Sequence, residues 1–220
     1  MDISKDFTVI GYYIVGPVSK PQYLSLHCDK ILSVSSCIDD IYPDLSGCLW
    51  RETGDSWEKY KAKLRLSEAE FKQMMEEVSD LFANNRMDVD GRFINLADAR
   101  HYYDSYIPKT LDAKIIAVLM LKEDAAQLIE EPYWGQNAVI SSENLTQGKL
   151  LGGEIIGFDC GSFHSYLCNG LDKDISERYT LSVDDYGVIQ NEFPQIRLFA
   201  ELIQGAGEPV LWLPCLLVDC

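Results

Sequence analysis

The chain has 220 residues, of which 47% are hydrophobic and 11% aromatic, so it is long and apolar enough to bury a full core. Its 35 acidic and 19 basic side chains give a formal net charge of −16, which disfavours binding to nucleic acid or anionic membranes and favours a basic protein partner. The acidic excess is concentrated in residues 121–220, which carry 16 acidic and 5 basic side chains.

The first predicted elements are strands. Phe7 to Val15 is rich in aromatic and β-branched residues, so we expect a strand in which Gly11 marks a bulge or a close approach. Ile31 to Ile38 is a second candidate strand. Glu58 to Leu66 alternates apolar residues with basic ones, which predicts a half-buried strand with a basic outer face. Lysines of this kind protect an exposed strand from edge-to-edge pairing, and phosphate binding is the alternative.

Two helices are predicted next. Ser67 and Glu70 have the spacing of a capping box, and apolar residues then recur at helical spacing as far as Phe82. This stripe is typical of a core-facing helix rather than of a methionine-rich recognition surface. Leu96 to Tyr106 predicts a second helix, which should end before Pro108.

The middle of the chain predicts buried strands. Asp112 to Leu121 is almost uninterrupted apolar sequence rich in branched residues, so we expect a central strand there. A short helix over Lys122 to Glu131 should follow and stop at Pro132. Leu151 to Asp159 predicts another strand, with a possible bend at Gly152-Gly153.

The last predicted elements are two helices and a strand. A helix is expected from about Ser162 to Arg178 and a second, amphipathic one from Phe193 to Gln204. The closing segment Pro209 to Val218 is apolar enough for a buried strand. Pro214 lacks a backbone N–H, so we expect an edge, a bulge or a break at that residue.

Together these elements predict a single α+β domain over residues 1–220, with a mixed or mainly antiparallel sheet packed with several helices. No repeat, low-complexity tract or long linker divides the chain. Residues 1–110 are the candidate for a more variable portion of this domain.

The sequence predicts a cytoplasmic protein without a membrane partner. Asp2 and Asp6 interrupt the opening residues, where a secretion signal would be basic and then apolar. The longest apolar runs are far shorter than the roughly 20 residues that cross a bilayer. The seven cysteines include no CxxC pair, which is typical of a reducing compartment.

Cys160, His164 and Cys168 follow one another at four-residue steps in the predicted helix, which raises two kinds of chemistry. Zinc–sulfur bonds are about 2.3 Å long, whereas eight residues of helix separate the cysteines by roughly 12 Å, so no metal site is expected. His164 and one cysteine would be neighbours on a helix and could form a thiol dyad. Cysteine is also a common core residue, and the apolar Phe163 and Leu167 beside it favour a structural role.

Other signatures of enzymes are missing from the sequence. It contains no nucleophile elbow, phosphate-binding loop, dinucleotide fingerprint or HExxH motif. We therefore predict no catalytic residue and no cofactor, with a cytosolic Cys/His thiol enzyme as the alternative.

Candidate partner contacts are acidic or aromatic residues in predicted loops. Adjacent acids in polar loops are usually solvated, so their expected use is electrostatic attraction of a partner rather than catalysis. These candidates are Asp39, Asp40, Asp44, Trp134, Asp184 and Asp185.

Three segments in the last third of the chain resemble a known family. The segments EIIGFDCGSFHSYLCNGLDKDI, DDYGVIQNE and GEPVLWLPCLLV are similar, in this order, to segments of bacterial immunity proteins from polymorphic toxin systems. The resemblance is carried by FHSxLCNGL, YGxI and WLP and covers roughly Gly153 to Val218. It implies a non-enzymatic inhibitor that binds a cognate toxin domain and blocks its active site or substrate groove.

The resemblance also implies roles for the residues and the partner. Together with the acidic charge, it suggests a toxin domain with a basic surface, such as a nuclease, and it identifies no contact residue. An acidic adaptor that binds some other protein is the remaining alternative. The motif would then be part of the scaffold, through Phe163, His164, Leu167, Cys168, Asn169 and Gly170.

Overall fold

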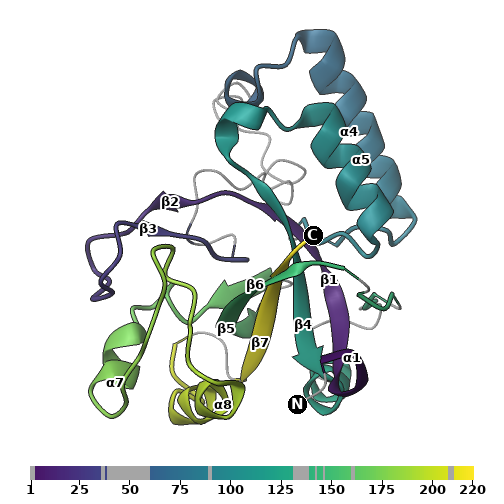
Figure 1. The fold of residues 1–220 in the computed structure, drawn as a ribbon. Helices are drawn as coiled ribbons and strands as arrows, with labels where there is room; N and C mark the ends of the chain where they lie inside the picture. The colour runs from purple at the N-terminus through teal and green to yellow at the C-terminus, as the bar shows by residue number, and fades with distance from the viewer. Residues whose placement is uncertain are drawn as a thin grey trace.

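The computed structural model describes residues 3–35, 38, 60–88, 91–130, 139–141, 143–145, 147–159, 162–207 and 211–220. Within these ranges, a five-stranded antiparallel sheet with the strand order β1-β4-β7-β5-β6 forms the centre (Figure 1). This sheet and the helices around it confirm the predicted α+β class and antiparallel sheet.

The central strands are β1 (Phe7–Val15), β4 (Lys114–Leu121), β5 (Lys149–Asp159), β6 (Ser162–Ser165) and β7 (Trp212–Asp219), and a separate antiparallel pair is formed by β2 (Val18–Ser19) and β3 (Lys30–Ile31). The helices are α1 (Ile3–Asp6), α4 (Glu68–Ala83), α5 (Leu96–Tyr106), the 3-10 turn η2 (Lys109–Leu111), α6 (Lys122–Glu130), α7 (Asp172–Ser176) and α8 (Phe193–Leu202).

The sheet is curled, so its two outermost strands approach each other. Tyr13 of β1 and Phe163 of β6 pack edge to face, with ring centroids 6.2 Å apart. Both rings belong to a buried cluster that also takes in side chains of β4, β5, β7 and α6. Burial of this apolar surface is the main term that holds the curl.

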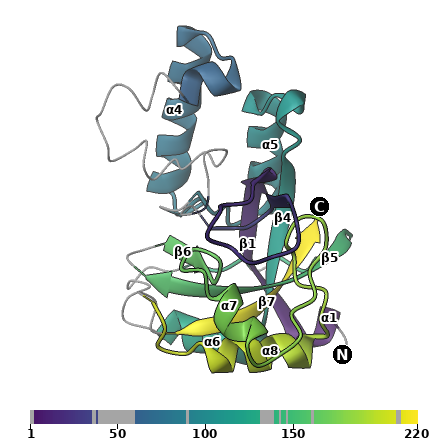
Figure 2. The same ribbon diagram turned by 90° about the vertical axis from the view of Figure 1, so that its left-hand side faces the viewer.

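Helices gather at both ends of the molecule. The helices α4 and α5 stand at one end, where their buried residues share a core with β1, β4 and β7 (Figures 1 and 2). At the other end α8 packs on β7 and β5, and α6 lies beside it (Figure 2). Arg197 of α8 donates to Asp124 of α6 at 2.8 Å, which links these two helices.

Most of the predicted elements are confirmed within a few residues. The capping box forms as expected, because the Ser67 side chain accepts from the backbone N–H of Glu70 and the Glu70 side chain accepts in return. The helices α4, α5, α6 and α8 and the strands β1, β4, β5 and β7 all fall on predicted segments. None of the helices in the described ranges is long and apolar enough to span a bilayer.

Gly11 serves both of the purposes that the sequence suggested. The register between β1 and β4 shifts between Val9 and Gly11, which is the signature of a bulge. The Arg92 side chain also lies against this glycine, because a Cβ added at position 11 would lie 2.5 Å from the Arg92 Cγ. A side chain at this position would displace Arg92.

Arg92 and Phe93 cover the open edge of β1. Phe93 exchanges two backbone hydrogen bonds with Tyr12, each 2.9 Å long. The Arg92 guanidinium is 1% exposed, donates to the backbone oxygen of Ile10 at 2.5 Å and pairs with Asp88. An edge strand that is covered in this way cannot template pairing with another chain.

The predicted strand over Glu58 to Leu66 is wrong, because residues 60–64 are helical. Tyr60 and Leu64 are both buried and lie four residues apart, as on one side of a helical turn. Lys61 and Lys63 are half-buried, so no basic strand face forms among the described residues here. The two roles considered for such a face, protection of a strand edge and phosphate binding, therefore have no support.

Two further strand predictions need correction. The strand expected over Ile31 to Ile38 is reduced to β3, which ends at Ile31, and residues 36 and 37 lie outside the described ranges. Pro214 lies in the centre of the sheet rather than at an edge. The pairing of β7 with β4 begins only at Cys215, so the proline faces no β4 residue that needs its missing N–H.

Candidate functional site

The FHSYLCNGL segment is not a helix, so the predicted helix over Ser162 to Arg178 is wrong. Residues 162–165 form β6, turns follow, and only α7 is helical. His164 is paired with Gly157 across the sheet, whereas Cys168 lies in the turn beyond. The neighbouring-turn geometry that suggested a Cys/His dyad is therefore absent. Cys160 lies outside the described residues.

The remaining motif residues hold the turn in place. Phe163 and Leu167 are each 1% exposed, and both belong to apolar clusters. Gly170 has a φ of +66°, a left-handed conformation that favours glycine. Asn169 is exposed, and its side chain lies close to Gly207. A Cβ added at Gly207 would lie 2.5 Å from the Asn169 Nδ2.

A buried carboxyl group joins the motif to the N-terminal third of the chain. Glu154 of β5 is 3% exposed and accepts from the Ser33 hydroxyl at 2.6 Å and from the Val34 N–H at 3.3 Å. Burial raises the pKa of Glu154, and hydrogen bonds from Ser165, Ser33 and Val34 oppose that rise. These bonds tie residues 33–34 to the sheet.

Two more side chains of the motif, those of Cys168 and Asp172, form hydrogen bonds with the same N-terminal segment. The Cys168 sulfur and the Ser35 hydroxyl lie 3.0 Å apart and share a hydrogen bond. Asp172, at the start of α7, is fully buried and accepts from the Ser25 N–H at 2.6 Å. Cys168 and one oxygen of Asp172 therefore bond inside the fold, whereas the Tyr166 hydroxyl and the other Asp172 oxygen are buried without a hydrogen-bond partner among the described residues.

Replacing Glu154 with glutamine should change how stability depends on pH. The folded-state pKa of Glu154 is raised, so its contribution is fully present below the unfolded value of 4.5 and is lost as pH rises through the folded value. Glutamine does not titrate. We expect the free energy of unfolding of Glu154→Gln, relative to the parent, to rise between pH 4 and pH 8 in urea titrations.

The exposed Glu130 provides the control for this titration, since Glu130→Gln should change little across the same pH range. The buried Asp124 and Asp172 also have raised pKa values, but they are common to all three proteins and cancel in the comparison. A constant difference between Glu154→Gln and the parent would contradict the prediction.

Residues 183–189 form a hairpin that carries the YGVI segment. Val183 pairs with Ile189, and the Asp184 side chain accepts from the backbone N–H groups of Tyr186 at 2.9 Å and Val188 at 3.0 Å. Asp184 is half-buried, and this predicted contact residue shapes the turn. Asp185 and Tyr186 lie exposed at the tip.

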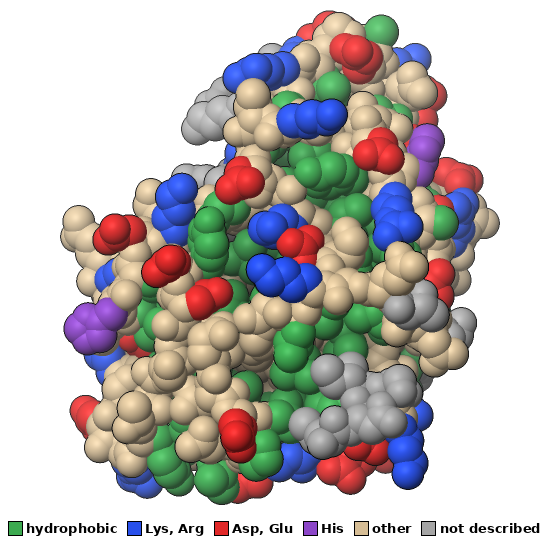
Figure 3. Space-filling model, in the orientation of Figure 1, with side chains coloured by type: hydrophobic (Ala, Val, Ile, Leu, Met, Phe, Trp, Pro, Cys, Tyr) green, Lys and Arg blue, Asp and Glu red, His purple; other side chains and the backbone are tan. Residues whose placement is uncertain are grey.

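The surface around the hairpin and α7 combines acids with tyrosines. Tyr23, Tyr179 and Tyr186 are 47%, 38% and 39% exposed, and Tyr23 lies against the motif turn at Gly170. Figure 3 shows acidic side chains scattered over the left half of this view, where β2, β3 and the hairpin lie in Figure 1. The exposed acids here include Asp174, Glu177, Asp185 and Glu192, and the basic Lys173 and Arg178 are exposed beside them.

Four of the predicted contact residues, Asp39, Asp40, Asp44 and Trp134, lie outside the described residues. Among the residues that the structure describes, no group of three or more His, Cys, Asp or Glu side chains is placed to hold a metal ion.

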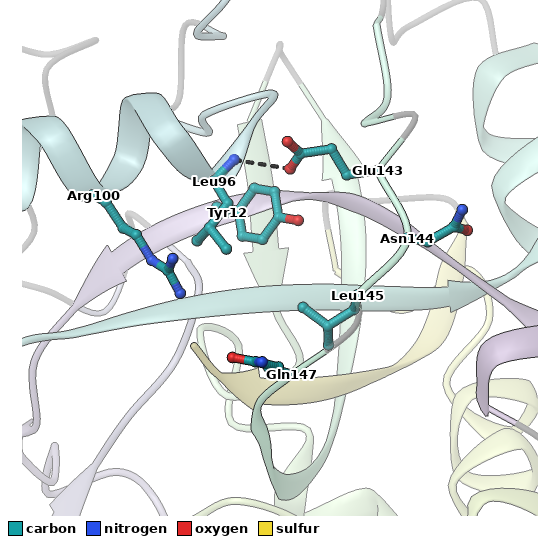
Figure 4. Close-up of a pocket in the computed structure, with 7 residues that line it drawn as sticks. All are labelled: Tyr12, Leu96, Arg100, Glu143, Asn144, Leu145 and Gln147. Atoms are coloured by element: carbon teal, nitrogen blue, oxygen red, sulfur yellow. Dashed lines mark hydrogen bonds between the residues drawn. The ribbon is translucent and has the colours of Figure 1, made fainter.

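A cavity of about 340 Å³ opens between α5 and the segment that precedes β5 (Figure 4). Sequence reasoning did not find it, because its lining comes from β1, α5 and residues 143–147, and no motif connects these segments. It is lined by Tyr12, Leu96, Arg100, Glu143, Asn144, Leu145 and Gln147.

Comparison of the chain with protein-family models, with curated proteins and with solved structures finds no match. The case for a function therefore rests on the three resembling segments and on the geometry around them.

Proposed function

We propose that this protein is an immunity protein that binds a cognate bacterial toxin domain and occludes its active site or substrate groove. The observation that carries the proposal is a contrast within the resembling segments between buried polar groups that bond inside the fold and groups that are exposed at the surface. Several of their buried polar groups bond inside the fold, namely Glu154, Cys168 and one oxygen of Asp172. Their exposed groups include the acidic Asp174 and Asp185 and the aromatic Tyr186, beside one exposed base, Lys173, on α7 and the 183–189 hairpin.

The interior arrangement favours a scaffold over a thiol enzyme. A reactive cysteine needs a lowered pKa and an electropositive, partly exposed setting. Cys168 instead shares a hydrogen bond with the Ser35 hydroxyl inside the turn. This contact suits a group that fixes the turn beneath the hairpin surface.

The exposed chemistry suits a basic protein partner. A net charge of −16 attracts a positively charged substrate groove at long range and accelerates encounter. Tyrosine is enriched at protein interfaces because it buries a large ring and keeps a polar hydroxyl. Asp185 and Tyr186 offer both properties at the hairpin tip, and we place the toxin contact there.

The first test is rescue and binding. We expect cells that express the toxin domain encoded beside this gene to survive only when the protein is co-expressed. The purified pair should bind one to one by calorimetry, and the association rate should fall steeply as salt is raised. Absence of both rescue and binding would reject the proposal.

A matched pair of double variants then tests the surface. Asp185→Asn with Tyr186→Ala should weaken toxin binding at least about tenfold, in line with loss of one interface anchor and one charge. Ile129→Ala with Glu130→Gln removes a similar apolar and acidic pair from the exposed side of α6 and should leave binding unchanged. The reverse pattern would move the contact surface to α6.

A further inference from the structure

One charged group that lines the cavity beside α5, Arg100, has no partner among the residues that the structure describes. Arg100 is exposed and makes no hydrogen bond or ion pair with any residue in the described part of the chain. Burial raises the pKa of the neighbouring Cys220 thiol, so this thiol stays neutral and does not balance the guanidinium. A guanidinium in a cavity wall is suited to bidentate binding of a carboxylate.

The acidic group in the cavity is already engaged. The Glu143 carboxylate accepts from the Leu96 N–H at 2.9 Å, at the first turn of α5 (Figure 4). Burial, followed by the contact with Glu143, raises the pKa of the Tyr12 phenol, which is therefore a neutral donor beside that carboxylate. Figure 4 shows Arg100 and Glu143 on different sides of the Tyr12 ring.

The rest of the lining is suited to an uncharged body. Leu96 and Leu145 are half-buried, and the Tyr12 ring is 1% exposed, so an apolar group inserted here would be shielded from water. Asn144 and Gln147 carry exposed amides with no hydrogen-bond partner among the described residues. Each amide offers a donor and an acceptor to a polar group.

We infer that this cavity binds a small organic acid. Its carboxylate pairs with Arg100, its short apolar body lies over Leu96 and Leu145, and an amide or similar polar end meets Gln147, whereas Asn144 lies at the far side of the view in Figure 4. The volume of about 340 Å³ is near the lower limit for small-molecule sites, which restricts the ligand to about the size of one acylated amino acid. The inference is independent of the proposed function.

The net negative charge of the protein does not prevent such binding. Interactions between exposed charges are largely screened beyond about 8 Å at physiological salt, so the groups within the cavity dominate. Arg100 lines the cavity without an ion-pair partner in the described ranges, and a ligand carboxylate would supply one.

The test uses N-acetyl-L-leucine and its neutral counterpart N-acetyl-L-leucinamide as probes. Titration of the ¹⁵N-labelled full chain at neutral pH should give saturable NMR shifts at Arg100 and at the side-chain amide of Gln147 with the acid. Arg100→Gln should weaken that binding about tenfold, as expected for loss of a charge-assisted pair.

Two controls make the result decisive. Arg178→Gln removes an equally exposed arginine that has no described side-chain partner, and it should leave the affinity unchanged. Equal binding of the leucinamide, or unchanged binding in Arg100→Gln, would overturn the inference. Tighter binding of the tripeptide Ala-Ala-Leu than of N-acetyl-L-leucine would also overturn it, because the ligand would then be a peptide end.

Discussion

Replacing Arg92 with methionine is expected to lower the free energy of unfolding by about 3–5 kcal/mol, the range for removing one member of a buried ion pair. The guanidinium donates to the backbone oxygens of Ile10 and Val139 at 2.5 and 3.0 Å, and methionine would remove both bonds, although the Ile10 oxygen also accepts from the Ser141 N–H at 3.4 Å. Its charge also lies 5.8 Å from the centre of the Phe163 ring. Urea unfolding monitored by circular dichroism measures the change.

Two companion variants locate the effect. Arg92→Lys keeps the charge but not the planar fork, so it should recover only part of the loss. The exposed Arg178 loses the same charge in Arg178→Met, and we expect a change within about 0.5 kcal/mol there. A loss in Arg92→Met no larger than in Arg178→Met would show that the buried contacts do not hold the edge of β1.

Gly152→Ala is the second substitution expected to have a large effect, with a loss of at least about 3 kcal/mol, the upper end of the range for overpacking. Gly152 has a φ of +147°, which side-chain-bearing residues rarely adopt. An added Cβ would also lie 2.4 Å from the backbone oxygen of Ile189. That segment bonds Gly153 through two backbone hydrogen bonds, so the methyl group would separate the hairpin from β5.

Gly205 provides the matched control. It has a φ of +74°, but a Cβ there would meet no heavy atom within 4 Å. Gly205→Ala should therefore cost only the left-handed strain, about 1–2 kcal/mol. Thermal and urea unfolding of both variants separates strain from steric clash. Equal losses of unfolding free energy in the two variants would show that the steric contact with Ile189 contributes nothing.

Segments whose apolar residues follow one clear period were predicted correctly, whereas segments that fit both the helical and the strand period were misassigned. Tyr60 and Leu64 are spaced by four residues, which satisfies both the alternation of a strand and the repeat of a helix, and the structure has the helix. Phe163, Leu167 and Leu171 are buried as the helical pattern requires. They are buried, however, by a strand and a turn, because tertiary contacts with residues 25–35 replace the expected helix.

The burial of Phe163 and Leu167 could be predicted from the sequence, but the partners of the polar groups around them could not. Glu154 is bonded to Ser33 and Cys168 to Ser35, across 121 and 133 residues of chain. No local pattern in the sequence reports such pairs. The same reason hid the cavity, where Tyr12 and Arg100 meet residues that follow them by more than forty positions.

The position of β7 in the sheet has a consequence for synthesis. This strand lies between β4 and β5, yet it spans Trp212–Asp219 and so leaves the ribosome after both of its neighbours. Until then β4 and β5 each have an unpaired side, and the two halves of the sheet cannot join. Non-local pairing of this kind is slow and exposes apolar strands to aggregation. The sheet can therefore close only after its last strand has been synthesised.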